Sequence, residues 1–165
     1  MKRFLFFVVL LFLFQGCEKD DICTPETPTT PRLIIEFYDS VNTSVKKVVA
    51  NLKAEGEGAD TALTFDLVST IELPLKTNED FTQYKLTINS TSATEANMDS
   101  IRINYTRNDI YISRACGFKT NFDLNLFNPI ENSNPVGDTE FWIDTIEIIK
   151  NKIETEDDVH IKMYF

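Results

Sequence analysis

Histidine and cysteine, which supply most catalytic bases and metal ligands, are scarce in this chain of 165 residues. It has one histidine, His160, and three cysteines. A metal site of the His/Cys type needs about four such ligands. With one cysteine lipidated and the other two paired, as predicted below, only His160 would be left, so the supply excludes such a site. His160 falls on the polar positions of the last predicted strand, so we expect an exposed surface side chain rather than a general base. No GxSxG nucleophile elbow occurs.

Glycine is also scarce, with five residues, and no glycine-rich loop could cradle a phosphate. The two acidic clusters, residues 18–21 and 154–158, lack the spacing of an EF-hand loop and are expected to be solvated. We therefore predict a non-enzymatic protein without metal or cofactor. The enzymatic alternative is a hydrolase with two carboxylates converging in one cleft.

Positive charge is in short supply. Sixteen Lys and Arg face 26 Asp and Glu, for a formal charge of −10. Removal of residues 1–16 would take Lys2 and Arg3 away and bring the charge to −12. Such a protein repels phosphate backbones, so nucleic acid is excluded as a partner.

The longest apolar run, residues 4–14, has eleven residues and is too short for a membrane-spanning helix, which needs about 20. Behind Lys2 and Arg3 it has the length of the apolar region of a secretory signal peptide. The run leads into Gly16-Cys17, which resembles a bacterial lipobox, although Phe14 and Gln15 depart from the usual residues. The alternatives are an ordinary signal peptide or a short uncleaved anchor.

Acylation of Cys17 would hold the protein on a membrane, because each buried CH₂ contributes about 0.8 kcal/mol and two chains suffice for stable anchoring. Residues 18–21, Glu-Lys-Asp-Asp, resemble the surface-export signal of Bacteroidota lipoproteins. This motif predicts an outer-membrane protein that faces out of the cell. Without the signal, the domain would face the periplasm.

Two thiols, Cys23 and Cys116, remain once Cys17 carries lipid. An exported chain with two cysteines usually pairs them, so we predict a Cys23–Cys116 disulfide. The alternative is two separately buried thiols. The bridge would close a loop of roughly 90 residues and hold the domain close to the membrane.

From Arg32 onward, apolar and polar residues alternate with the period of half-buried strands. Together with the signal-peptide pattern and the three prolines of residues 24–31, the alternation predicts a division into a lipoprotein signal peptide (1–16), a lipidated N-terminus with a Pro/Thr-rich connector (17–31) and a single domain (32–165). Segment 45–55 alternates too, although its Ala, Lys and Glu also favour helix. Pro74 suggests a sheet edge or a bulge. Further strands are predicted at 33–38, 63–67, 71–75, 84–88, 101–106, 110–116, 118–126, 141–149 and 159–165. In segment 118–126 the apolar residues Phe118, Phe122, Leu124 and Leu126 share one face, which we expect to be the inner one.

About nine strands with frequent turn signals predict an all-β protein, an antiparallel β-sandwich of immunoglobulin-like or transthyretin-like type. A small outer-membrane β-barrel is the alternative, because alternation alone does not say whether the apolar face meets a core or lipid. Most predicted strands have 5–8 residues, short of the 9–11 that a membrane strand needs.

Several segments together resemble a family of small Bacteroidota lipoproteins catalogued as a domain of unknown function. They are CEKDDIC, PRLIIEFYD, STIELPLKT, NYTRNDIYISRACGFKTNF and DDVHIKMYF. The most specific part is residues 105–120. The resemblance implies the cell envelope and lipidation, and it implies no activity.

A hairpin around residues 108–113 carries the candidate ligand-binding residues Arg107, Tyr111 and Arg114. Guanidinium groups and aromatic faces could recognise an anionic ligand or a sugar. The alternative is cross-strand pairing with the many carboxylates. A tight turn is expected at Asn108-Asp109.

The sequence thus predicts a lipid-anchored binding or accessory subunit of an envelope complex, with a surface carbohydrate-binding module as the alternative. Loops 89–100 and 128–138 are the expected binding faces. Four triplets resemble an O-glycosylation acceptor, and those at Asp39 and Asp99 fall in predicted turns; the triplets begin at Asp39, Asp60, Asp99 and Asp144.

Overall fold

The computed structural model describes residues 22–135 and 140–165. The predicted signal peptide, Cys17 and the acidic residues 18–21 lie outside the described residues. The described residues fall into two compact units. The smaller comprises the chain up to Thr29 with Ile110–Lys119, and the larger comprises Thr30–Asp109 with Thr120–Phe165.

All regular structure in the described residues is β, with eleven strands and no helix. The prediction of an all-β sandwich is confirmed, with two strands more than expected. The strands are β1 (Leu33–Tyr38), β2 (Leu52–Gly56), β3 (Leu63–Phe65), β4 (Thr70–Leu73), β5 (Phe81–Ile88), β6 (Asn97–Ser113), β7 (Gly117–Leu124), β8 (Ile130–Ser133), β9 (Thr145–Ile148), β10 (Lys152–Ile153) and β11 (Ile161–Tyr164).

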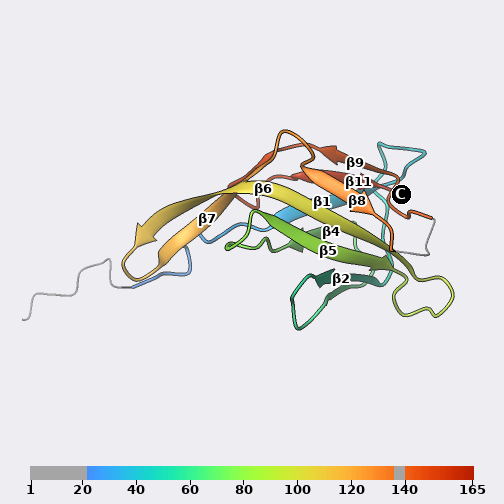
Figure 1. Cartoon of the computed structure of the whole chain (residues 1–165), viewed down its shortest axis with the longest axis horizontal. Coiled ribbons are helices and arrows are strands. Elements are labelled where there is room, and N and C mark those ends of the chain that lie inside the picture. Colours follow the sequence, from blue (N-terminus) through green and yellow to red (C-terminus); the bar gives the residue numbers. More distant parts are fainter. Residues whose placement is uncertain (1–21, 136–139) are drawn as a thin grey trace, which may run out of the picture. The chain divides into compact units, whose positions relative to one another are not determined.

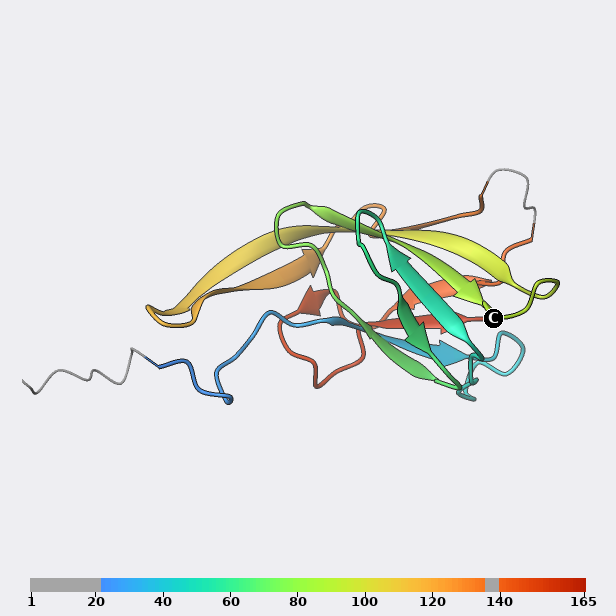
Figure 2. The same cartoon turned by 90° about the horizontal axis from the view of Figure 1, so that it is seen from below.

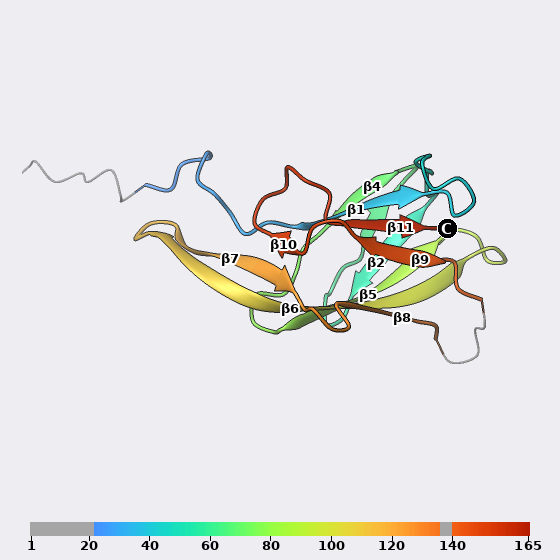
Figure 3. The ribbon, with the colours of Figure 1, turned by 90° about the horizontal axis from the view of Figure 1, so that it is seen from above.

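One sheet has four strands in the order β4-β1-β11-β9, which lie side by side in Figure 3. The first and last strands of the chain pair in parallel, with Ile35 opposite Ile161. The pairs β1–β4 and β11–β9 are antiparallel. β4 is an edge strand that ends directly before Pro74, as the proline suggested.

The other sheet has the order β10-β7-β6-β5-β2-β3, with β8 also paired to β6. β6 is the longest strand and pairs with β5 over its first half (Figure 1). Its residues Ile110–Ser113 belong to the smaller unit, together with the first residues of β7.

The core of the larger unit lies between the two sheets, which Figure 2 shows as two layers. Alternate residues of each strand point into it, as the period-two pattern predicted. β1 contributes Leu33, Ile35 and Phe37, which pack with Ile101 and Ile103 of β6 in one cluster. Trp142 packs at a tilt against Phe37 and edge-on against Phe165, and it donates its indole N–H to the carbonyl of Leu86 at 2.9 Å.

β1 is buried on both faces, although its outer positions include a carboxylate. Glu36 accepts hydrogen bonds from Tyr38 (2.8 Å) and Lys46. Burial by itself raises the pKa of Glu36, but these two donors outweigh it and lower the pKa below its ordinary value. The outer face of this sheet is thus closed by satisfied polar side chains.

Segment 45–55 differs from its prediction as a strand. Only its end forms β2; Lys46 and Val49 make isolated bridges to Tyr38 and Val68. Asn51 has a φ of +47°, which breaks the extended backbone just before β2. Alternation was present, but its two valines at 45 and 48 are half exposed and make no continuous inner face.

The predicted turn at Asn108-Asp109 is wrong, because β6 runs straight through it. Asp109 accepts a hydrogen bond from the hydroxyl of Thr120 on β7 at 2.6 Å, and this bond satisfies its carboxylate within the ladder. The loop predicted at 89–100 is shorter, since β6 begins at Asn97. The loop predicted at 128–138 contains β8, and its residues 136–138 lie outside the described residues.

Two predictions about which side chains point into the core were also wrong. Phe118 and Leu126 were expected on the inner face with Phe122 and Leu124, yet they are 67% and 86% exposed. Phe118 belongs to the smaller unit, and Leu126 follows the end of β7. The strand expected at 141–149 is only β9, and the buried Trp142 precedes it in irregular structure.

Candidate functional site

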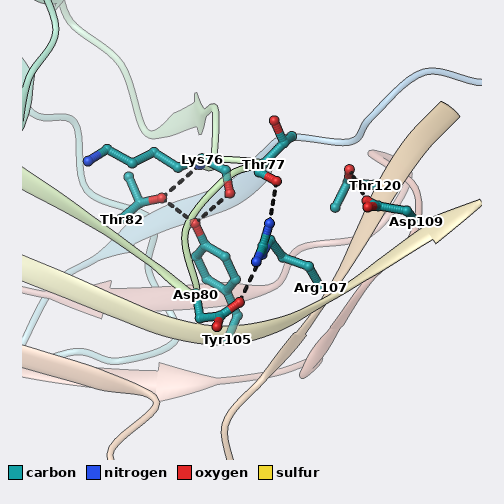
Figure 4. A network of polar contacts seen from close by, with 8 residues as sticks. All are labelled: Lys76, Thr77, Asp80, Thr82, Tyr105, Arg107, Asp109 and Thr120. Carbon is teal, nitrogen blue, oxygen red and sulfur yellow. Dashed lines mark hydrogen bonds and ion pairs between the residues drawn. The ribbon is translucent and has the colours of Figure 1, made fainter. Parts of the chain in front are cut away.

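Arg107, one of the three candidate ligand residues, is engaged within the larger unit. Its Nε donates to Asp80 Oδ1 at 2.8 Å, and its Nη1 donates to the carbonyl of Thr77 at 2.6 Å (Figure 4). The hydrogen bond with Asp80 raises the pKa of the guanidinium above its ordinary value. Arg107 thus fastens segment 77–80 to β6, which is the cross-strand pairing that was the alternative to ligand binding.

Tyr105 extends the same network into the core. Its hydroxyl lies 2.6 Å from Thr82 Oγ1 and donates to the carbonyl of Lys76 at 2.9 Å (Figure 4). Burial raises the pKa of Tyr105, and its ring packs edge-on against Phe122 at 5.0 Å between centroids. The network organises the β4–β5 connection.

Tyr111 and Arg114, the other two candidate residues, belong to the smaller unit. The Tyr111 ring makes an edge contact with Phe118 across the β6–β7 hairpin, 5.3 Å between ring centroids. Both rings are mostly exposed, at 56% and 67%, and Arg114 in the turn is exposed as well. This aromatic pair is a surface feature with no role in the sandwich core.

The disulfide in the smaller unit joins Cys23 to Cys116, as predicted from the compartment. The Cα atoms are 5.1 Å apart and the cysteines are 93 positions apart in sequence. The backbone N–H of Cys116 donates to Ser113 Oγ, which shapes the turn after β6. The bridge ties the chain six positions after Cys17 to the turn between the two hairpin strands.

An open groove of about 590 Å³ lies in the larger unit beside edge strand β9. Sequence reasoning did not find it, because its walls are far apart in the chain and meet through the parallel β1–β11 pair. The Tyr164 hydroxyl donates to Glu147 Oε2 at 2.7 Å, and this bond raises the pKa of Tyr164 to about 12. The lining of the groove consists of hydroxyls, carboxylates and one isoleucine, and its polar members are Ser40, Thr43, Asp144, Thr145, Glu147 and Tyr164.

His160 is fully buried, so the expectation of an exposed surface histidine is wrong. Its Nδ1 accepts the backbone N–H of Ile34 at 3.0 Å, and its own backbone N–H donates to the carbonyl of Ile34. Burial lowers the pKa of His160 below its ordinary value, with Lys150 acting in the same direction. The imidazole is a neutral hydrogen-bond acceptor of the core.

The acidic segment 154–158 is engaged in ion pairs. Glu156 accepts a two-pronged hydrogen bond from Arg32 at 2.7 and 2.6 Å, which lowers the pKa of that carboxyl. Asp158 pairs with Lys150 at 2.6 Å. Across residues 22–135 and 140–165, no group of three His, Cys, Asp or Glu side chains is placed to hold a metal ion.

The triplets that resemble glycosylation acceptors occupy different surroundings. Asp99 is fully buried within β6, so its predicted place in a turn is wrong. Asp39 does lie in a turn and accepts backbone N–H groups from Val41 and Asn42. Thr61 and Thr145 are exposed.

Comparison with known proteins yields one family. The sequence profile of a family of unknown function, DUF6452, matches residues 48–165. No curated protein and no solved structure matches the chain. Among the described residues there is no helix of the length and apolarity needed to cross a bilayer.

Proposed function

The chain belongs to this family of unknown function, DUF6452, and from that premise we propose that it is a lipid-anchored cell-envelope protein. In this proposal it is a non-enzymatic binding or accessory subunit at the outer membrane, and it faces out of the cell. The anchor would be Cys17, with residues 18–21 as the export signal. The alternative orientation faces the periplasm.

The observation that carries this proposal is the Cys23–Cys116 bridge. Disulfides persist in oxidising compartments and are rare in the cytosol, so the bridge agrees with an exported chain. It also leaves Cys17 as the one remaining cysteine of three, directly after the apolar run and Gly16. The signal-peptide pattern and the pairing of the other two thiols therefore support the same compartment.

A binding role is favoured over catalysis by where the chemistry-bearing side chains lie. The single histidine is buried with Nδ1 committed to a backbone amide, so it is not available to a substrate as a base. Arg107 is committed to Asp80. In the groove beside β9 the Tyr164 hydroxyl is hydrogen-bonded to Glu147, and this bond raises the pKa of Tyr164 to about 12, which keeps the phenol protonated near neutral pH.

That groove favours carbohydrate binding as a second candidate function. Its hydroxyls and carboxylates can pair with the hydroxyl groups of a sugar, and its size lies within the range of small-ligand sites. This moves the carbohydrate-binding proposal away from Tyr111 to Asp144, Glu147 and Tyr164.

The first experiment compares three chains in intact cells: the wild type, Cys17→Ala, and a chain with Asp20→Ser and Asp21→Ser. Protease is added outside the cells, and crosslinked complexes are then purified. The proposal expects the wild type to be shaved and to bring down one outer-membrane partner, Cys17→Ala to leave the membrane fraction, and the double variant to stay membrane-bound but protected. A wild type that carries no acyl chain would refute the anchor.

A glycan array tests the carbohydrate alternative. Binding that is lost with Asp144→Asn and Glu147→Gln but kept with Tyr111→Ala would place the sugar in the groove. The reverse pattern would return it to the hairpin. An array without any binding would reject the carbohydrate function and leave the protein-partner proposal.

A further inference from the structure

The smaller unit gathers three large exposed apolar side chains beside the disulfide. Ile22 is 71% exposed, directly before Cys23, and Tyr111 and Phe118 face each other on the hairpin that Cys116 closes. We call these three residues with Arg114 the hairpin tip. All of them belong to one compact unit, so their proximity follows from that unit alone.

The charge of this unit differs from that of the rest of the chain. Its described residues carry two cations, Arg114 and Lys119, and one carboxylate, Glu26. The whole chain has a formal charge of −10. The described part of the unit therefore has one more cation than carboxylates, although residues 18–21, which precede it in the sequence, add three carboxylates and one lysine. The combination of aromatic side chains with arginine suits the phosphate and glycerol layer of a membrane surface.

The reach of the chain keeps this unit at the membrane if Cys17 carries lipid. From Cys17 to Cys23 there are six residue steps, which span at most about 20 Å when fully extended. A tether this short gives an effective concentration in the millimolar range. Even a weak contact between the tip and the headgroups would then be populated.

We propose that the hairpin tip is a lipid-contacting surface, with Ile22 and Phe118 in the headgroup layer, Tyr111 at its boundary and Arg114 on the phosphates. The proposal rests on the anchor at Cys17 from the proposed function. The disulfide has a defined role in it. The bridge shortens the tether and fixes the hairpin next to the lipid, where otherwise 13 residue steps would separate Cys17 from Thr30, the first residue of the larger unit.

The test uses the lipidated full chain with Phe118→Trp, reconstituted in phosphatidylethanolamine and phosphatidylglycerol vesicles that contain acyl-brominated phosphatidylcholine. Bromine quenches an indole that lies among the lipid. The native Trp142 is buried in the core and gives the background. The matched control is Phe127→Trp, which replaces an even more exposed aromatic residue, 87% exposed, in a loop of the larger unit.

We expect the brominated lipid to lower the emission from Phe118→Trp about twofold, because aromatic side chains settle at the bilayer interface, and to leave Phe127→Trp at the background level. Breaking the bridge with Cys23→Ser and Cys116→Ser in the Phe118→Trp chain should remove most of that quenching. Equal quenching of both indoles, or none at Phe118→Trp on vesicle-bound protein, would overturn the proposal. In the second case the tip faces a protein partner or water.

The proposed lipidation of Cys17 and the proposed lipid contact of the hairpin tip can be tested separately. Because Cys23 and Cys116 are bridged, a maleimide lipid reacts with the thiol of Cys17 alone. If mass spectrometry finds no acyl chain on the native protein, the proposed function is wrong, and the chemically attached lipid supplies the same tether. Quenching measured on that conjugate then confirms or overturns lipid contact by the tip.

Discussion

The buried histidine makes stability depend on pH in a predictable direction. His160 is 0% exposed, and its ring accepts the Ile34 amide proton at Nδ1. Burial lowers the pKa of the ring, while Asp158, the Thr155 backbone and Glu156 oppose the shift without reversing it. The folded protein therefore holds a neutral imidazole, and protonation would remove the acceptor of a core hydrogen bond.

The sign follows from proton linkage. In the unfolded chain histidine titrates near pH 6.5, so below that pH the unfolded state binds a proton that the folded state does not. The contribution of His160 to the free energy of unfolding is complete above about pH 6.5. It is lost as the pH falls toward the lower pKa of the folded state, by at most about 1.4 kcal/mol per pH unit.

The assay is urea unfolding of the disulfide-bonded protein from about pH 7.5 to about pH 5.5, where the maximal loss through His160 is about 1.4 kcal/mol. His160→Asn is the matched variant, because an amide oxygen can accept the Ile34 N–H but does not titrate. We expect the wild type to lose stability over this interval and the variant to lose much less. The carboxyls of Glu36, Glu156 and Asp158 have lowered pKa values, so their contributions are lost only at more acid pH.

Equal losses in the two proteins would refute the reasoning, since the change would then come from groups other than His160. A wild type that becomes more stable on acidification relative to His160→Asn would show that the folded ring takes up a proton more readily than the unfolded one. Either result would contradict a buried neutral ring.

Three other predictions concern stability and are measured by the same urea unfolding. Tyr105→Phe should cost about 1–3 kcal/mol, because the hydroxyl of Thr82 and the carbonyl of Lys76 lose a buried partner; an unchanged midpoint would contradict the network of Figure 4. Replacing both Cys23 and Cys116 by serine should cost up to about 4–5 kcal/mol through the larger freedom of the unfolded chain, and reduction of the wild type should reproduce the effect. Phe122→Ala should cost about 3–5 kcal/mol, whereas Phe127→Ser, in a side chain 87% exposed, should be nearly neutral; similar losses would mean that the assigned inner face of β7 is wrong.

The alternation of apolar and polar residues was sufficient to predict the fold class, because successive side chains of a β-strand point to opposite faces of the sheet. It identified the inner residues of β1, Leu33, Ile35 and Phe37, and those of β11, Ile161 and Met163, all of which are buried. It could not show that these two strands pair in parallel. That pairing depends on contacts between residues more than 120 positions apart.

The errors have a shared cause, which is that alternation does not report where a strand leaves the core. The β6–β7 hairpin continues past the last core residue, so Phe118 keeps the inward phase of Phe122 and Leu124 but lies outside the core cluster. By alternation His160 falls on the polar face of its segment. It is nevertheless buried, because its own backbone hydrogen-bonds to Ile34 on one neighbouring segment and to Ile149 on another. A polar position in the alternating pattern thus predicted an exposed side chain only where no other segment covered that face of the strand.

At the candidate site, too, some contacts could be predicted from the sequence, and those that depend on distant segments could not. The disulfide was predictable because compartment and cysteine count restrict the pairing to two residues. The hydrogen bond between Arg107 and Asp80 was not predictable, because Asp80 lies 27 positions away on the β4–β5 connection. All three candidates are exposed, but Arg107 is hydrogen-bonded to Asp80 and Thr77, whereas Tyr111 and Arg114 lie in the unit that also holds the disulfide.

The placement of that unit in the sequence gives the strongest reason to connect its chemistry with the anchor. An exposed aromatic pair on a protein surface ordinarily carries no information about its partner. Here the covalent bridge joins the turn that presents the pair to a residue six positions from Cys17, so any lipid on Cys17 brings a membrane within about 20 Å of Cys23. A partner protein would have to be recruited to the tip, whereas the membrane would already be there. For this reason the lipid surface is the first occupant to test.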